Sequence, residues 1–69
     1  MKRRDLIRKI AKEAKRQGVS WIEGEGGKHS TYMLGSHTIP VPRHTEIGEG
    51  LAEQIFKECE SELGRRWWK

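Results

Sequence analysis

Residues 26–44, with the sequence GGKHSTYMLGSHTIPVPRH, contain the pattern that decides the fold. Gly35-Ser36 is a tight-turn signal between two strand-like runs of alternating residues. We therefore expect a strand over residues 28–34 and another over residues 37–41, joined as a hairpin. The glycine pair that opens the stretch weakens regular structure there and indicates a turn.

The alternation gives the two faces of this hairpin different characters, because successive side chains of a strand point to opposite sides. The core face is expected to carry Tyr32, Leu34, Ile39 and Val41. The open face is expected to carry His29, Thr31 and Met33. Two prolines, Pro40 and Pro42, cannot donate a ladder hydrogen bond, so residues 37–41 should form an edge strand or end there.

Two amphipathic segments flank the hairpin. Residues 5–17 place apolar side chains at helical spacing and end at Gly18, and residues 49–63 do the same before Gly64. Their apolar stripes are Leu6, Ile7, Ile10, Ala11 and Ala14, and then Leu51, Ala52, Ile55, Phe56, Cys59 and Leu63. Residues 1–4 are basic and expected to fray, and residues 19–25 predict a first strand.

The order helix, strand, strand, strand, helix predicts an α+β domain of two layers. Both helices should cover one face of a three-stranded antiparallel sheet, and the other face should stay open. A single domain over residues 1–64 is expected, followed by a basic aromatic tail over residues 65–69. Tails of this kind are usually mobile. Its tryptophans, Trp67 and Trp68, suit either stacking on bases or anchoring a partner protein.

Composition narrows the classes of function. The chain has 69 residues, a net charge of +4 and a sequence pI of about 9.6, which favours an anionic partner such as nucleic acid or an acidic protein. The one cysteine, Cys59, falls on an apolar stripe and is expected in the core. No metal-ligand spacing, cofactor motif, membrane-length apolar run or signal peptide is visible, so a cytoplasmic protein without metal or cofactor is expected.

The chain resembles the HicA (YcfA-like) family of toxins from toxin–antitoxin pairs. Three features carry the resemblance from Lys2 to Leu63: the basic helix that ends at Gly18, the run Gly27-Lys28-His29-Ser30-Thr31-Tyr32, and Val41-Pro42-Arg43-His44 before a glycine-containing turn. The run is similar to the Gly-Ser-His-x-x-Tyr strand of the family, although Lys28 stands where the family usually has serine. The turn before His29 is also longer and richer in glycine than usual, and the second hairpin is unusually short.

The resemblance implies a fold like a double-stranded-RNA-binding domain. It also implies an mRNA interferase of a type II system, an endoribonuclease that arrests translation, with His29 as the catalytic residue. A HicB-type antitoxin that covers the active site is the implied protein partner. The tail after Gly64 lies outside the resemblance.

Metal-independent RNA cleavage needs a base, an acid and cations around the reacting phosphate. Histidine has the pKa range for the proton transfers, and Lys28 and Arg43 are candidates for binding the phosphate. His37 and His44 are candidate auxiliary groups, although an ordinary turn residue and a loop residue are the interpretations that we favour for them. Without catalysis, two other functions stay open: a double-stranded-RNA-binding module of the same fold, and an inactive protein that only forms complexes.

Overall fold

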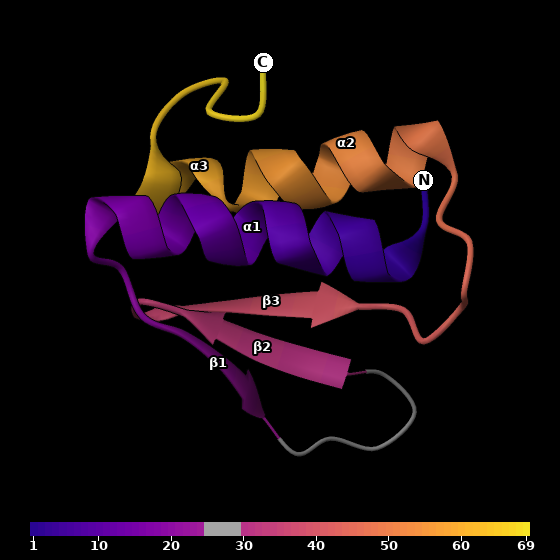
Figure 1. The fold of residues 1–69 in the computed structure, drawn as a ribbon, viewed down its shortest axis with the longest axis horizontal. Helices are drawn as coiled ribbons and strands as arrows, with labels where there is room; N and C mark the ends of the chain where they lie inside the picture. Colours follow the sequence, from indigo (N-terminus) through magenta and orange to yellow (C-terminus); the bar gives the residue numbers. More distant parts are fainter. Residues whose placement is uncertain (25–29) are drawn as a thin grey trace.

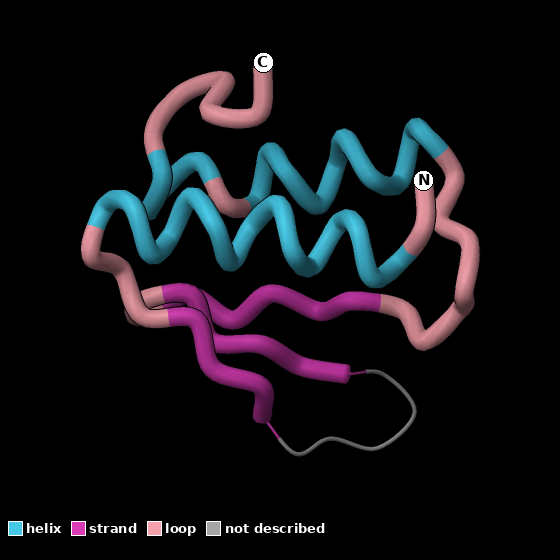
Figure 2. The backbone as a smooth tube through the Cα atoms, in the orientation of Figure 1, coloured by secondary structure: helices cyan, strands magenta, loops and turns pink. Residues whose placement is uncertain are grey.

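A computed structural model of the chain describes residues 1–24 and 30–69. Its helices are α1 (Arg3–Gln17), α2 (Glu49–Glu58) and α3 (Glu60–Leu63), and its strands are β1 (Trp21–Gly24), β2 (Ser30–Leu34) and β3 (His37–Val41). The strands form one antiparallel sheet in the order β1-β2-β3. Figures 1 and 2 show the helices stacked on one side of this sheet, which confirms the expected α+β architecture.

The hairpin of β2 and β3 has the predicted register. Leu34 pairs with His37, so Gly35 and Ser36 form a two-residue connection. Gly35 has φ 60°, which is the left-handed region that glycine accepts without strain. A Cβ at this position would stand 2.2 Å from Oε1 of Glu62, so a larger residue would also displace the Glu62 side chain. β3 is an edge strand, as its prolines predict.

The core lies between the sheet and the helices. The predicted core face of the hairpin is confirmed, since Tyr32, Leu34, Ile39 and Val41 are all buried. The helices and the turn at Cys59 contribute Leu6, Ile10, Ala14, Ala52, Ile55, Phe56, Cys59 and Leu63, and the loop before α2 contributes Ile47. Trp21 of β1 stacks on Tyr32 with ring centroids 4.5 Å apart, which extends the core face toward the second edge of the sheet.

The amino-terminal residues are ordered, so the expectation that residues 1–4 fray is wrong. α1 begins at Arg3, two residues earlier than Asp5. Lys2 forms an antiparallel bridge with Glu46, and the backbone N–H of Arg3 donates to the carbonyl oxygen of Thr45 at 2.8 Å. These bonds satisfy donors that the first turn of a helix leaves without an internal partner.

The last helix is interrupted where the sequence predicts continuity over residues 49–63. A turn at Cys59 separates α2 from α3, and the Cys59 N–H is shared between the carbonyl oxygens of Ile55 at 3.3 Å and Phe56 at 3.1 Å. Shared bonds of this kind are common where a helix ends. The other residues of the predicted apolar stripe are buried, whereas Leu51 is 42% exposed and contributes little to the core.

The tail packs against the helical layer, in contrast to the mobile tail that its composition suggests. It turns back over α2 and α3 in Figure 1. The indole Nε1–H of Trp67 donates to the carbonyl oxygen of Phe56 at 2.8 Å, and the Trp67 and Phe56 rings meet edge to face with centroids 5.1 Å apart. Trp68 also lies against Phe56, at 5.9 Å. Burial of two large aromatic rings offsets the entropy that ordering a short tail costs.

Candidate functional site

Two of the predicted site residues, His29 and Lys28, lie outside the described residues. The chain resumes at Ser30, whose Cα pairs with that of Val41 at the end of β3. Arg43 follows two residues later along the chain. The site is therefore built here from the surface around Arg43.

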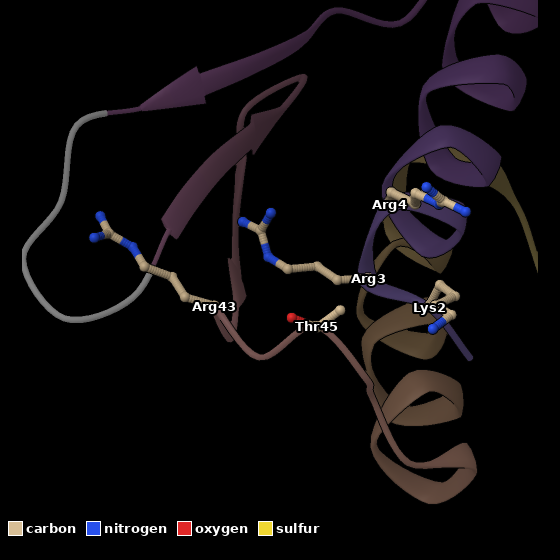
Figure 3. Close-up of a pocket in the computed structure, with 5 residues that line it drawn as sticks. All are labelled: Lys2, Arg3, Arg4, Arg43 and Thr45. Carbon is tan, nitrogen blue, oxygen red and sulfur yellow. The ribbon is translucent and has the colours of Figure 1, made fainter.

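Arg43 lines a surface pocket of about 330 Å³ together with Lys2, Arg3, Arg4 and Thr45. We call this set of residues the amino-terminal cation pocket. Figure 3 shows Arg3 reaching from the start of α1 toward the loop that carries Arg43 and Thr45, whereas the Arg4 guanidinium points away from Arg43. Four cationic side chains thus border one shallow surface, and among the described residues the only other lining side chain is a neutral threonine.

Backbone contacts bring the two halves of the pocket together across the sequence. The N–H of Arg3 donates to the carbonyl oxygen of Thr45, and the side-chain Nε–H of Arg3 donates to the carbonyl oxygen of Pro42 at 2.8 Å. The second bond fixes the direction of the guanidinium. It uses Nε only, and no described residue accepts from the two terminal nitrogens. Those nitrogens form the fork that matches two oxygens of a phosphate.

One carboxylate lies close to the pocket and reduces its positive charge on one side. Oε1 of Glu46 stands 3.3 Å from Nζ of Lys2, and its Oε2 stands 3.0 Å from the amino-terminal ammonium. Hydrogen bonds from the ammonium and from Lys2 hold the pKa of Glu46 below its usual value. The charge of Lys2 is therefore partly neutralised, which leaves Arg3 as a stronger anion-binding group than Lys2.

The auxiliary histidine candidates lie apart from each other. His37 opens β3 and pairs with Leu34, at the opposite end of the hairpin from Ser30. A strand of this length rises roughly 13 Å from its first residue to its last. The Nδ1 of His37 lies 3.3 Å from Oγ of Ser61, which agrees with His37 as an ordinary surface residue that has a hydrogen-bond partner. His44 is exposed between Arg43 and Thr45 but does not line the pocket.

The sequence pointed to Arg43 and missed Lys2, Arg3 and Arg4. The available signal was their run of charge directly before the acidic residue Asp5, which suits the first turn of a helix. A run of cations at the start of a chain carries no information on what packs against it. Only the bonds to Pro42 and Thr45 show that Arg3 belongs to the same surface as Arg43.

The open face of the sheet presents apolar side chains. Ile22 is 59% exposed and pairs across the strands with Met33, which is 36% exposed. The hydroxyl of Thr38 lies 3.2 Å from Sδ of Met33 on the next strand. Ile22 and Met33 thus form an exposed apolar pair on this face of the sheet.

Other reactive groups of the described chain do not form a site. Burial raises the pKa of the Cys59 thiol to about 12, so this thiol stays protonated at neutral pH and is a core group. Within residues 1–24 and 30–69, no three histidine, cysteine or acidic side chains gather closely enough to hold a metal ion. The helices in these ranges are also too short or too polar to cross a membrane.

Comparisons of the chain with models of protein families, with curated proteins and with solved structures found no significant match.

Proposed function

We propose that the protein is an endoribonuclease toxin that cleaves mRNA without a metal ion, as the resemblance to HicA toxins implies. The observation that carries the proposal is the amino-terminal cation pocket, which gathers Arg3 and Arg43 on one surface of a strongly basic chain. The α+β architecture is compatible with the double-stranded-RNA-binding-domain-like fold that the same resemblance implies.

The reaction is the attack of a ribose 2′-oxygen on the adjacent phosphorus, with loss of the 5′-oxygen of the next nucleotide. The two products are a 2′,3′-cyclic phosphate and a free 5′-hydroxyl. Negative charge builds up on the non-bridging oxygens as the phosphorane forms. Guanidinium groups that already point at this position stabilise the transition state without having to reorganise. Arg3 suits this role because its Nε bond to Pro42 sets its direction in advance.

The proton transfers are assigned to His29. This residue precedes Ser30 in the chain, and Ser30 pairs with Val41, which is two residues before Arg43. The imidazole titrates near neutral pH and therefore suits a general base or acid. In this proposal Lys28 and Arg43 bind the phosphate. His37 is not needed, since it pairs at the other end of the hairpin.

We also propose a HicB-type antitoxin as the protein partner and the cytoplasm as the compartment. The exposed strip of Ile22 and Met33 on the open face of the sheet supports a protein contact there. Apolar side chains of this kind are what a stable protein interface buries at its centre. A partner on this face would lie on the same sheet that His29 leads into.

A second function is favoured by the outer face of α1. Arg8, Lys12 and Lys15 are exposed along this helix, and phosphate contacts from such a row suffice to bind double-stranded RNA by shape. The protein would then bind duplex RNA without cleaving it. This alternative predicts binding that does not depend on His29 and no arrest of growth.

The variant His29→Ala tests the proposal. Induced in bacterial cells, the parent protein should arrest growth and the variant should not. Purified and supplied with single-stranded RNA in the presence of a chelator, the variant should cleave about 10²–10⁴-fold more slowly, the range that a general acid–base group contributes. Circular dichroism should show the same fold for both proteins.

His37→Ala is the matched control, because it removes an exposed imidazole from the far end of the hairpin. It should cleave within about tenfold of the parent, below the range of a general acid–base group. Equal toxicity of the parent and His29→Ala would remove His29 from the mechanism. An absence of cleavage by the parent, with duplex RNA still bound, would establish the binding module instead.

A further inference from the structure

The tail holds one indole ring in a fixed position beside α1. Trp67 donates its Nε1–H to the carbonyl oxygen of Phe56, and its plane stands at 85° to the Phe56 ring. This angle means that the Trp67 indole stands roughly perpendicular to the Phe56 ring. Trp67 is only half-buried in this position.

Trp67 lines a surface cavity of about 370 Å³ together with Lys9, Lys12, Glu13 and Arg16 of α1. We call this set of residues the tryptophan groove. Its volume lies near the lower end of the range of small-ligand sites, which is about 300–1,000 Å³. The groove therefore offers room for one small group against an aromatic wall, with cationic side chains around it.

The charges in the groove do not cancel. The Glu13 carboxylate accepts hydrogen bonds from two guanidinium nitrogens of Arg16, of which Nε lies at 3.0 Å. It also accepts one from the Gln17 amide at 2.6 Å. These bonds lower the pKa of Glu13 to about 2, so its charge is present at neutral pH and is matched by Arg16. Lys9 and Lys12 remain as the uncompensated cations. The Lys9 ammonium stands 5.8 Å from the centre of the Phe56 ring, next to the indole.

The other tryptophan faces a different environment. Trp68 lines a separate cavity with Glu49 and Glu53, and the Lys69 ammonium stands 5.9 Å from the centre of its ring. The two carboxylates of this cavity offset the charge of Lys69, whereas Lys9 and Lys12 of the groove have no carboxylate partner among the described residues, so an anionic aromatic ligand would select the Trp67 side. This contrast makes Trp68 an internal reference for Trp67.

We propose that the tryptophan groove binds one nucleotide of a single-stranded RNA, with the base stacked on Trp67 and the phosphates facing Lys9 and Lys12. Base stacking on aromatic side chains within a cationic groove is how proteins hold single strands without reading their sequence. An acidic peptide would satisfy the lysines but would leave the indole face without a planar partner. The choice of RNA as the anion rests on the proposed function, whereas the site itself uses none of the residues assigned to cleavage.

A fully 2′-O-methylated single-stranded oligoribonucleotide is the probe, because it lacks the nucleophile and cannot be cleaved. Its binding to the full chain is measured by fluorescence anisotropy. Trp67→Leu keeps an apolar side chain but removes the stacking face, so the dissociation constant should rise at least about fivefold. Trp67→Phe should bind more tightly than Trp67→Leu, and Trp68→Leu should bind nearly as well as the parent.

The lysines provide a pair of variants that does not disturb the core. Lys12→Gln and Lys57→Gln remove the same charge from exposed helical positions, but only Lys12 lines the groove. Lys12→Gln should weaken binding and lower the slope of log affinity against log salt concentration by about 0.7, the value for one phosphate contact to a single strand. Lys57→Gln should leave the slope unchanged.

Equal affinities of the parent and of folded Trp67→Leu would overturn the inference, and so would equal salt slopes for the two lysine variants. If polyglutamate displaces the probe equally well from the parent and from Trp67→Leu, the groove is a surface for acidic proteins instead. The outcome is independent of cleavage: binding that depends on Trp67 without cleavage of unmodified RNA would refute the proposed function alone. Cleavage that depends on His29 without an effect of Trp67 on binding would refute this inference alone.

Discussion

The amino-terminal cation pocket and the tryptophan groove are similar in size, at about 330 and 370 Å³, but differ in how they are built. The pocket is lined by arginines, a lysine and a threonine, and none of these described lining residues carries an aromatic ring. The groove has an indole as one wall, and α1 contributes two lysines and an arginine that is paired with Glu13. The first suits a phosphate, whereas the second suits a planar base with a phosphate beside it.

The two surfaces also depend on different contacts. The pocket is held by bonds from Arg3 to the backbone of Pro42 and Thr45, which lie about forty positions further along the chain. The groove is held by the tail, through the bond from Trp67 to Phe56. The comparison shows that the amino-terminal end of the chain is fixed against the loop between β3 and α2, whereas the carboxyl-terminal tail is fixed against α2.

The largest expected effect comes from the residue that supports the groove. Phe56→Ala removes a ring that is 5% exposed and contacts both Trp67 and Trp68, so the free energy of unfolding should fall by about 3–5 kcal/mol. Lys57→Ala, at the next position, loses an exposed ion pair in which Nζ of Lys57 lies 3.8 Å from Oε1 of Glu53. The free energy of unfolding of this variant should change by less than about 0.5 kcal/mol. Chemical denaturation measures the free energy of unfolding of both variants. A loss below about 1 kcal/mol for Phe56→Ala would show that the tail does not depend on the core.

A smaller effect is expected at the pocket and should appear in cleavage. Arg3→Ala removes a charged hydrogen-bond donor from the proposed phosphate site, so kcat/KM for RNA should fall about tenfold to a hundredfold. Arg4→Ala removes the same charge from a side chain that points away from Arg43, and should have the weaker effect. Equal losses from the two variants would show that the pocket acts only through its net charge, without a directed contact. The Arg3 variant should still bind the uncleavable probe through Trp67.

The smallest effect should come from the carboxylate in the groove. The pKa of Glu13 in the folded protein is about 2, below its ordinary value of 4.5, so Glu13 stabilises the fold above about pH 4.5 and this contribution is lost as the pH falls through 2. Glu13→Gln should therefore make acid unfolding less steep in that interval. At pH 7 the same variant should bind single-stranded RNA about twofold to fivefold more tightly, since it leaves Arg16 unneutralised. Unchanged or weaker binding would mean that Arg16 does not face the ligand.

Periodicity predicted the parts of the fold that depend on neighbours in the chain. The alternation around Gly35 identified the hairpin and its core face, and helical spacing identified Cys59 as buried. The same local reasoning failed at the ends of the chain. Residues 1–4 and 65–69 are short and polar, with no periodicity, so the contacts that order them cannot be inferred from the segments themselves.

The sequence by itself determined an α+β domain, a glycine turn, an edge strand and Arg43 as a candidate for binding phosphate. His29 and Lys28 stay predictions from the sequence and its resemblance. Only the tertiary structure placed Arg3 beside Arg43 and Trp67 beside Lys12. The physical reason is that local patterns record which face of an element is apolar, whereas hydrogen bonds from Arg3 to Pro42 and from Trp67 to Phe56 form only after separate elements have packed together.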